Sequence, residues 1–396
     1  MSERADAVVV GGGIIGASIA HFLTTLDYGD VVLVEKRRLA RGSTQYSAAH
    51  VRQHYTNEVA IRLAVRAAGK FANAEEELGG DVGFVQAGYM VLATAEEAHA
   101  IREVVPVQQR FGVQTGFLTP EEVVERWPEL EIDGIALACY EETSGYADPV
   151  RTVEALARSV VGRGLDVREG CEVLDVATSG GRVTGVVTTE GTIATGVVVN
   201  ATGPWGNTIG RMVGVEYPIR FSREHEAIFR APDGFRGLPV MSDSAQQLYF
   251  RSYGPDKVLV GEGWPKTPEP DDPETYDAGT DDAHLARMVP KLLRRVPALR
   301  ATLGRPGFGG AYVTGYSGVY DITDDWYPIV GEEDVGGYYS AFGGSGHGFK
   351  IGPTIGESLA HVIAGNEPPV DISSLSGSRF AEGRSFTSVW GPGNRA

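Results

Sequence analysis

The chain has 396 residues, 42% hydrophobic and 22% charged, an ordinary balance for an enzyme of two domains or one large intertwined pair. Its formal net charge of -17 argues against nucleic acid and anionic membrane surfaces as partners. The two cysteines, Cys139 and Cys171, form neither a disulfide framework nor a zinc-binding spacing, so we expect a reducing compartment and no metal site. No apolar run is long enough to span a membrane, and the first strand is expected directly after Met1–Asp6 without a signal peptide, which predicts a cytoplasmic protein.

The first predicted elements are a strand, a glycine turn and a helix. Ala7–Val10 is an apolar, mostly β-branched run that is typical of a central parallel strand. The glycines that follow, Gly11, Gly13 and Gly16, have the spacing of the dinucleotide fingerprint. In that fingerprint the glycines permit a tight turn, a close approach of backbone to pyrophosphate and close helix packing, while the helix N-terminus offers N–H groups to phosphates. This order of elements predicts a nucleotide site.

A second strand is predicted over Val31–Glu35. It ends in Glu35, whose carboxylate is placed to accept hydrogen bonds from a ribose hydroxyl; a solvated strand end is the alternative. The basic run Lys36–Arg38 would also suit the 2′-phosphate of NADPH, but the rest of the chain favours FAD.

The segments after the second strand lead into a part, from Phe84 onward, that does not resemble either half of a plain Rossmann unit and is assigned to a second domain. Turn signals and apolar spacing predict a small polar loop over Gly42–Tyr55 that suits a flat ligand, a helix over Asn57–Leu78, a strand pair over Phe84–Ala93 and a helix from Thr94 toward Phe111. A further helix starts at Thr119–Glu122, where a threonine cap, a proline and two acids coincide.

The following residues again have the sequence pattern of a nucleotide-binding domain. We predict a helix over Val150–Arg163, a strand over Asp166–Val173, a β-meander over Val176–Thr195 and a buried strand with a glycine turn over Val197–Trp205. Later elements are a run of strands over Tyr217–Gly263, a surface loop over Trp264–Asp282, a helix over Leu285–Arg295, a strand from Tyr338, a glycine loop over Gly343–Gly352 and a helix to about Ala364. After Pro368 a loosely ordered tail is expected.

Motifs spread over nearly the whole chain resemble the D-amino-acid oxidase and sarcosine oxidase superfamily of flavoproteins. They are Gly11–Gly16, Gly42–Arg52, Asn200–Gly203, Gly318–Gly331 and Gly346–Lys350. The likeness is greatest to the sarcosine oxidase branch, which includes the β subunits of multi-subunit sarcosine oxidases and proline dehydrogenases. It implies an α/β fold: a glutathione-reductase-like Rossmann FAD domain with an inserted, mixed-sheet α+β substrate domain.

The resemblance also implies domain boundaries. The FAD-binding domain is expected over residues 1–83, 148–215 and 318–370, the substrate domain over 84–147 and 216–317, and a C-terminal tail over 371–396.

The expected cofactor is FAD, held without a covalent link. Gly318 replaces the cysteine, and Tyr46-Ser47 the Trp-His pair, through which two branches of the family attach flavin. Positive potential near the flavin pyrimidine ring is expected from the glycine loop and from the start of a helix after Gly352-Pro353. The expected FAD-binding residues are Gly11, Gly13, Ile14, Ile15, Gly16, Glu35, Lys36, Gly42, Ser43, Thr44, Ser47, Ala48, Ala49, Val173, Ala201, Thr202, Gly203, Trp205, Gly344, Gly346, His347, Gly348, Phe349 and Lys350.

The resemblance implies that Arg52 and Lys350 hold a substrate carboxylate, one as a planar two-donor group and the other as a point charge. The alternatives are a surface salt bridge for Arg52 and a solvated side chain for Lys350. Tyr320 corresponds to an aromatic position over the flavin.

Three further positions are weaker expectations. Tyr249 and Tyr253 are substrate-site candidates for which plain packing is the alternative, and His347 suits either the flavin ring or a structural role in the glycine loop. The oxygen-activating lysine of the family aligns near Leu259, and Lys257 is left open. Without a cation there, electrons would pass to an acceptor other than oxygen.

The predicted reaction is oxidation of the C–N bond of a small amino or imino acid, sarcosine-like or proline-like, by hydride transfer to flavin. Oxygen or another electron acceptor takes the electrons, and a homo- or hetero-oligomer is left open. One rival is an FAD-dependent 2-hydroxy-acid dehydrogenase with His50, His54 or His347 as its base. The other is a flavin-carrying subunit with little activity alone.

Overall fold

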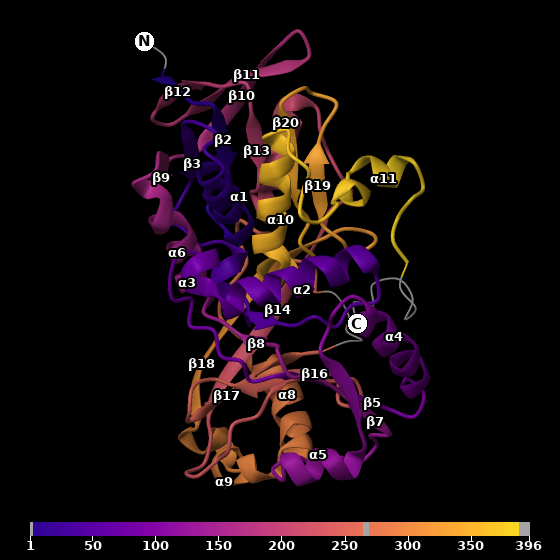
Figure 1. Cartoon of the computed structure of the whole chain (residues 1–396). Coiled ribbons are helices and arrows are strands. Elements are labelled where there is room, and N and C mark those ends of the chain that lie inside the picture. Colours follow the sequence, from indigo (N-terminus) through magenta and orange to yellow (C-terminus); the bar gives the residue numbers. More distant parts are fainter. Residues whose placement is uncertain (1–2, 264–268, 388–396) are drawn as a thin grey trace.

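The computed structural model describes residues 3–263 and 269–387, which form two lobes (Figure 1). The upper lobe in that view contains α1 (Ile14–Thr25) and α10 (Gly348–Ile363), and the lower lobe contains α5 (Pro120–Arg126) and α8 (Asp282–Arg295). Residues 264–268 of the predicted surface loop and 388–396 of the predicted tail lie outside the described residues.

A six-stranded sheet forms the centre of the upper lobe. Its order is β19 (Ile329–Glu332), β20 (Tyr338–Phe342), β13 (Val198–Asn200), β2 (Ala7–Val10), β3 (Val31–Glu35) and β9 (Leu165–Glu169). All neighbours are parallel except β19 and β20. Its central strands are buried on both faces, which explains their unbroken apolar sequences. The predicted strands at the N-terminus are confirmed.

Helices cover one face of this sheet and a second sheet covers the other. Helices α1, α10 and α6 (Pro149–Val161) share a core with one set of its side chains. The opposite side chains pack on a four-stranded sheet with the order β1 (Glu3–Arg4), β12 (Gly191–Ala194), β11 (Arg182–Thr188) and β10 (Val173–Ser179). The last three strands are the predicted β-meander.

The lower lobe is an eight-stranded mixed sheet. Its order is β18 (Tyr312–Ile322), β14 (Arg220–Arg230), β17 (Lys257–Glu262), β16 (Leu248–Ser252), β15 (Val240–Asp243), β5 (Tyr89–Ala93), β7 (Leu137–Glu141) and β6 (Thr115–Leu118). Helices α5, α8 and α9 (Arg300–Leu303) pack on one face, and α4 (Ala98–Arg110) packs on the other. The predicted fold class, a Rossmann-type α/β unit with an inserted mixed sheet, is confirmed.

Shorter elements complete the fold. They are β4 (His50–Val51) paired with β8 (Gly145–Tyr146), α2 (Glu58–Ala72), α3 (Ala74–Glu77), α7 (Gly206–Gly210), α11 (Ser378–Ala381) and the 3-10 turns at Ser43–Tyr46, Gly203–Trp205, Arg211–Val213, Pro297–Leu299, Pro306–Gly310 and Ser373–Leu375. No helix among residues 3–263 and 269–387 combines the length and apolarity needed to cross a bilayer.

Three predicted elements are divided or shortened in the structure. The helix over Asn57–Leu78 is divided at Asn73, where the backbone leaves the helical region. Only Tyr89–Ala93 of the predicted strand pair is a strand, and the residues before it make a single bridge. The strand over Asp166–Val173 is divided by a turn at Gly170, whose φ is +74°.

The last helix begins earlier than predicted. It starts at Gly348, after His347, and Pro353 lies in its interior rather than before its first turn. Proline removes one helical hydrogen bond. The helix tolerates this because it is buried on nearly all sides, so that tertiary packing outweighs local propensity.

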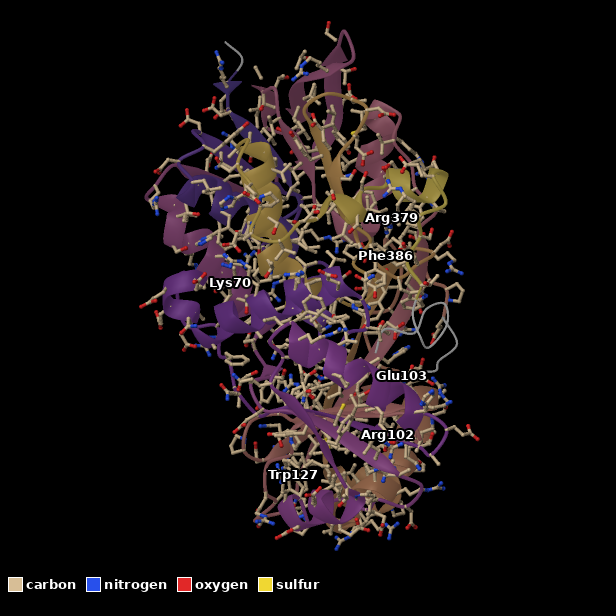
Figure 2. All side chains as sticks on the ribbon, turned by 45° about the vertical axis from the view of Figure 1, so that its right-hand side comes forward. Lys70, Arg102, Glu103, Trp127, Arg379 and Phe386 are labelled. Atoms are coloured by element: carbon tan, nitrogen blue, oxygen red, sulfur yellow. The ribbon has the colours of Figure 1, made fainter. Side chains whose placement is uncertain are left out.

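The segment after Pro368 is not loosely ordered in its described part. Arg379 is fully buried and donates to both carboxylate oxygens of Asp325, at 2.8 and 3.0 Å. The ring of Phe386 lies 4.5 Å from that of Tyr327. Figure 2 shows Arg379 and Phe386 side by side, and 5.7 Å separates the guanidinium from the ring. A long-range ion pair therefore fixes a segment whose own sequence is polar.

Candidate active site

The glycine turn after β2 leaves no room for side chains. A Cβ on Gly16 would lie 1.9 Å from the carbonyl oxygen of Gly11, and a Cβ on Gly11 would lie 2.6 Å from that of Ala201. Gly11 also has a φ of +105°, which favours glycine. Helix α1 starts here with Gly13 as its N-cap, and Thr44 Oγ1 accepts the N–H of Ile14 at 3.1 Å. Bare backbone and a helix N-terminus thus face one cavity, as a pyrophosphate requires.

Glu35 lies at the end of β3 and closes one end of this turn. Its two carboxylate oxygens accept the N–H groups of Gly12 and Arg37, both at 2.8 Å. The neighbouring Lys36 is paired with Glu274 at 3.0 Å. Because Glu274 brings a negative charge to the basic residues that a 2′-phosphate would need, this end of the cavity suits FAD better than NADPH.

One cavity runs between the six-stranded sheet and the segments beside it, and most of the predicted FAD-binding residues line it. These are Gly11, Gly13, Ile14, Ile15, Glu35, Lys36, Gly42, Ser43, Thr44, Ser47, Val173, Ala201, Thr202, Gly203, Trp205, Gly344, Gly346, Gly348 and Phe349, together with the predicted substrate-site residue Tyr320. Lining residues that sequence reasoning missed include Arg37, Cys171, Thr208, Glu274 and Asp321. The predicted residues Gly16, Ala48, Ala49, His347 and Lys350 lie outside the lining.

Asp321 shapes the glycine loop at the far end of the cavity. Its Oδ2 accepts the N–H of Gly343 at 2.7 Å, and burial raises its pKa to about 6 against the lowering effect of the loop N–H groups. Ser345 in the loop has a φ of +47°, and its hydroxyl oxygen accepts the N–H of Thr323 at 3.2 Å. The loop is therefore held by long-range contacts as well as by its glycines.

Three cations lie around the half-buried His50, between the two lobes. They are Arg52, Lys350 and Arg251. Burial first, and their charges second, hold the pKa of His50 well below its usual value, so the imidazole is neutral. Its Nε2 is buried and has no hydrogen-bond partner among the described residues, and its ring meets the ring of Tyr249 edge-on at 5.3 Å. The three positive charges give this region an electrostatic potential that attracts a carboxylate.

Aromatic rings hold the Arg52 side chain. Its guanidinium lies 4.4 Å from the ring centre of Tyr55 and 5.7 Å from that of Tyr89, and it donates to the carbonyl oxygen of His54. It is therefore not in the surface salt bridge that was the alternative reading. His347 lies behind the same ring, with Nδ1 at 2.9 Å from the hydroxyl of Tyr55.

A buried carboxylate supports the backbone beside Arg52. Glu141 accepts the N–H of Gln53 at 2.8 Å and the hydroxyl of Ser144 at 2.6 Å. Burial raises its pKa to about 7, against the lowering effects of these hydrogen bonds and of Arg52. Sequence reasoning missed Glu141, because it is one of 52 acidic residues and no motif marks it.

Arg251 also lies near His50 and was missed by sequence reasoning. Its Nε and Nη2 donate to the carbonyl oxygen of Ala48 at 3.1 and 2.9 Å, and its guanidinium lies 4.0 Å from the ring centre of Tyr146. The next residue, Ala49, has a φ of +51°, which is rare for alanine. Arg251 thus holds the segment that leads to Arg52 in a strained conformation.

The remaining candidates have defined places. The hydroxyl of Tyr249 donates to Glu226 at 3.1 Å, and the ring of Tyr253 is 40% exposed beside Arg251. Lys350 donates to the carbonyl oxygen of Gly346 at 3.3 Å, so it is buried rather than solvated.

Two positions bear on flavin attachment and oxygen chemistry. A Cβ on Gly318 would lie 2.8 Å from the Cβ of Tyr46, so the position has no space for a cysteine without a shift. Lys257 pairs with Asp256 at 2.7 Å, and it faces Arg230 at the end of β14.

Comparison with known proteins shows the family to which the chain is similar. A family model described as "DAO: FAD dependent oxidoreductase" matches residues 6–362. The chain is 28% identical over 393 residues to mitochondrial sarcosine dehydrogenase of Mus musculus, with 96% of this chain and 42% of that protein covered. It is 30% identical over 383 residues to 4-methylaminobutanoate oxidase (formaldehyde-forming) of Paenarthrobacter nicotinovorans, with 94% and 45% covered. The chain therefore spans less than half the length of these two relatives.

A solved structure is similar over the whole chain. L-proline dehydrogenase from P. horikoshii superposes with a TM-score of 0.88 and 29% identity, covering 98% of this chain and 100% of that one. The family match over most of the chain, together with the glycine turn and the cavity that it opens onto, shows that the chain belongs to the FAD-dependent oxidoreductases of the D-amino-acid oxidase family.

Proposed function

We propose that this enzyme oxidises the C–N bond of a small amino or imino acid that carries a carboxylate, such as an N-methyl amino acid or a proline-like acid. The observation that carries the proposal is the convergence of Arg52, Lys350 and Arg251 on one buried region beside the dinucleotide cavity. The relatives named above act on sarcosine, 4-methylaminobutanoate and L-proline, and each of these substrates joins an amine to a carboxylate.

FAD supplies the hydride acceptor when it is bound. The backbone of the turn at Gly11 and the start of α1 would hold its pyrophosphate, and Glu35 would accept from its ribose. The glycine loop before α10 and the N-terminus of that helix would lie near the ring, where the positive end of the helix dipole stabilises negative charge. Ser47 and Gly318 offer neither the histidine nor the cysteine through which two branches of the family attach flavin, so FAD would be held without a covalent link.

The three cations have two consequences for a substrate. Arg52 is fixed by the rings beneath it, so it presents its N–H groups to a carboxylate with little loss of side-chain entropy. Lys350 adds a second positive charge to the same region. Their combined potential disfavours an ammonium group, so a bound amine is shifted toward its neutral form, whose lone pair assists loss of a hydride from the adjacent carbon.

Anaerobic mixing with a panel of amino, imino and 2-hydroxy acids tests the proposal, with bleaching of the flavin absorbance as the signal. We expect bleaching by a secondary or cyclic amino acid. In Arg52→Met the apparent substrate Kd should rise by about 10- to 100-fold, because a charge-assisted hydrogen bond contributes about 1.5–3 kcal/mol. Arg62→Met is the matched control, since Arg62 is exposed and its contacts are an ion pair with Glu58 and the ring of Phe111, away from His50. A panel in which no amino or imino acid bleaches the flavin removes the proposal.

A 2-hydroxy acid is the second candidate substrate, and His50 is the observation that favours it. A neutral imidazole whose Nε2 has no hydrogen-bond partner among the described residues suits the general base that an alcohol needs. His54 does not suit this role, because burial and the charge of Arg52 lower its pKa to about 3 and Gln108 occupies its Nδ1 at 3.1 Å. Bleaching by hydroxy acids alone would select this function.

A flavin-carrying role within a larger assembly is the third candidate. The observation behind it is that the chain spans less than half of the two relatives described above. Purified alone, such a chain would hold FAD but turn over none of the acids until a partner was added.

A further inference from the structure

His225 lies on β14 and points away from the substrate region. Its neighbour Glu226 contacts Tyr249 on one face of the sheet, so strand alternation places the imidazole on the opposite face, toward α8. There its ring stacks on that of His284, at 5.0 Å and 25°. The side chain of His225 is 3% exposed, although two carboxylates lie beside it.

These two carboxylates belong to Glu269 and Asp281, whose side chains are roughly half exposed. Nε2 of His225 lies 3.5 Å from Oε2 of Glu269 and 3.7 Å from Oδ2 of Asp281. The three ligand atoms all lie within 4.8 Å of one another. Ligands about 2.0–2.1 Å from a tetrahedral zinc ion are about 3.3 Å apart, so small side-chain shifts would seat an ion between them.

The second ring nitrogen indicates how the imidazole is oriented. Nδ1 lies 3.5 Å from the hydroxyl oxygen of Thr280, and that hydroxyl donates to the carbonyl oxygens of Glu226 and Tyr316, at 3.0 and 3.2 Å. The hydroxyl oxygen is thus left to accept from Nδ1–H. A proton on Nδ1 leaves a lone pair on Nε2, which has no hydrogen-bond partner among the described residues and faces two negative groups. The two carboxylates therefore favour a cation at this point, and a protein group on the second imidazole nitrogen is the usual support of a metal-bound histidine.

The nearest protein cation does not fill this place. Arg223 is anchored elsewhere, because its Nε donates to Ser317 at 3.1 Å and its Nη2 donates to the carbonyl oxygen of Gly279 at 2.8 Å. Its Nη1 comes within 3.8 Å of Oε1 of Glu269, which leaves Oε2 of that carboxylate toward His225.

We propose that His225, Glu269 and Asp281 bind a divalent transition-metal ion of the zinc type, with water completing its coordination. One imidazole and two carboxylates are donors that such ions accept. The ion would join β14 to both ends of the segment 269–281.

That segment closes the dinucleotide cavity. Glu274, near its middle, lines the cavity and pairs with Lys36, while the ring of Tyr276 lies 6.5 Å from that of Tyr46. An ion that fixes residues 269 and 281 restricts the residues between them in the open state of the segment. The open state therefore gains less conformational entropy, and opening is less favourable. The metal ion therefore slows release of FAD. This step rests on the FAD site described above but not on the identity of the substrate.

The experiment uses chelator-treated holoenzyme and Zn2+ as the probe. Titration calorimetry should show one tight site per chain, and Co2+ in its place should give the visible absorption of a low-symmetry site outside the flavin bands. In Glu269→Gln and Asp281→Asn the affinity should fall roughly 10- to 100-fold or more. Asp281→Asn keeps the helix cap that Asp281 gives to His284, because asparagine is an equally good N-cap, so a folding defect is not expected. Asp271→Asn is the matched control in the same segment.

The second readout is the rate at which FAD fluorescence appears on dilution. Zn2+ should slow this rate in the wild type and in Asp271→Asn but not in Asp281→Asn. Zn2+ binding that is equally tight in Glu269→Gln and Asp281→Asn overturns the site. Binding that leaves the FAD release rate unchanged overturns the closing role. Neither measurement involves a substrate, so both outcomes are independent of the proposed function.

Discussion

Replacing Glu141 tests whether a buried, ionisable carboxyl group supports the backbone beside Arg52. Replacing it by glutamine keeps an oxygen for the N–H of Gln53 and the hydroxyl of Ser144, and removes only the ability to ionise. The replacement NH2 group would point toward the ring of His54, whose Nδ1 lies 3.9 Å from Oε1. The shape of the site is therefore retained.

The size of the effect follows from the pKa of Glu141. Burial raises this pKa from its ordinary 4.5 to about 7, so the folded protein binds more protons than the unfolded chain between these values. Stability from this group is fully present below pH 4.5 and falls as the pH rises through about 7. Integrated from pH 5.5 to 8, the loss in the free energy of unfolding is about 2 kcal/mol.

Urea denaturation of the holoenzyme at pH 5.5 and pH 8 measures this loss. All other titrating groups contribute to both proteins, so the difference between wild type and Glu141→Gln isolates the one carboxyl group. We expect the wild type to lose about 2 kcal/mol relative to the variant over this range. If the difference is the same at both pH values, or if the wild type gains stability relative to the variant as the pH rises, the pKa of Glu141 is not raised by burial in the folded protein.

Three further changes have defined outcomes. Gly16→Ala should abolish FAD retention, measured as the ratio of flavin to protein absorbance, because its Cβ would lie 1.9 Å from a carbonyl oxygen; Gly69→Ala is the control, with nothing within 4 Å of its Cβ. Arg379→Met should reduce the free energy of unfolding by about 3–5 kcal/mol, because it leaves Asp325 buried and unpaired, and an unchanged urea midpoint would show that the segment is dispensable. Asp321→Ala should lower stability by about 1–3 kcal/mol, because the N–H of Gly343 loses its acceptor, and should also weaken FAD binding in a fluorescence titration.

The nucleotide half was predictable because its constraints are local. Backbone atoms that nearly touch impose glycine at positions 11 and 16, so the requirement is visible in the sequence as spacing. The strands on either side are buried on both faces and read as unbroken apolar runs.

The start of α10 was not predictable in the same way. A proline usually marks the first turn of a helix, and Pro353 led to a start that is too late. The true N-cap, His347, makes no capping hydrogen bond through its side chain, so no local signal marks it. The segment that contains Arg379 is similar, because the acid that orders it is 54 residues away in the chain.

The substrate region was the least predictable, because it depends on strand register. Alternation along β16 indicates that Tyr249 and Arg251 lie on the same face of the sheet. Which residues that face contacts depends on the pairing of β15 with β5, which is distant in the sequence. The family cation was expected near Leu259 on β17, and the structure has Arg251 directly opposite Leu259 on the neighbouring strand. A charge acts through distance rather than through position in the chain, so a cation on either strand gives the region a similar potential. Sequence alignment follows a single strand, whereas the position of Arg251 opposite Leu259 is visible only once the strands are paired.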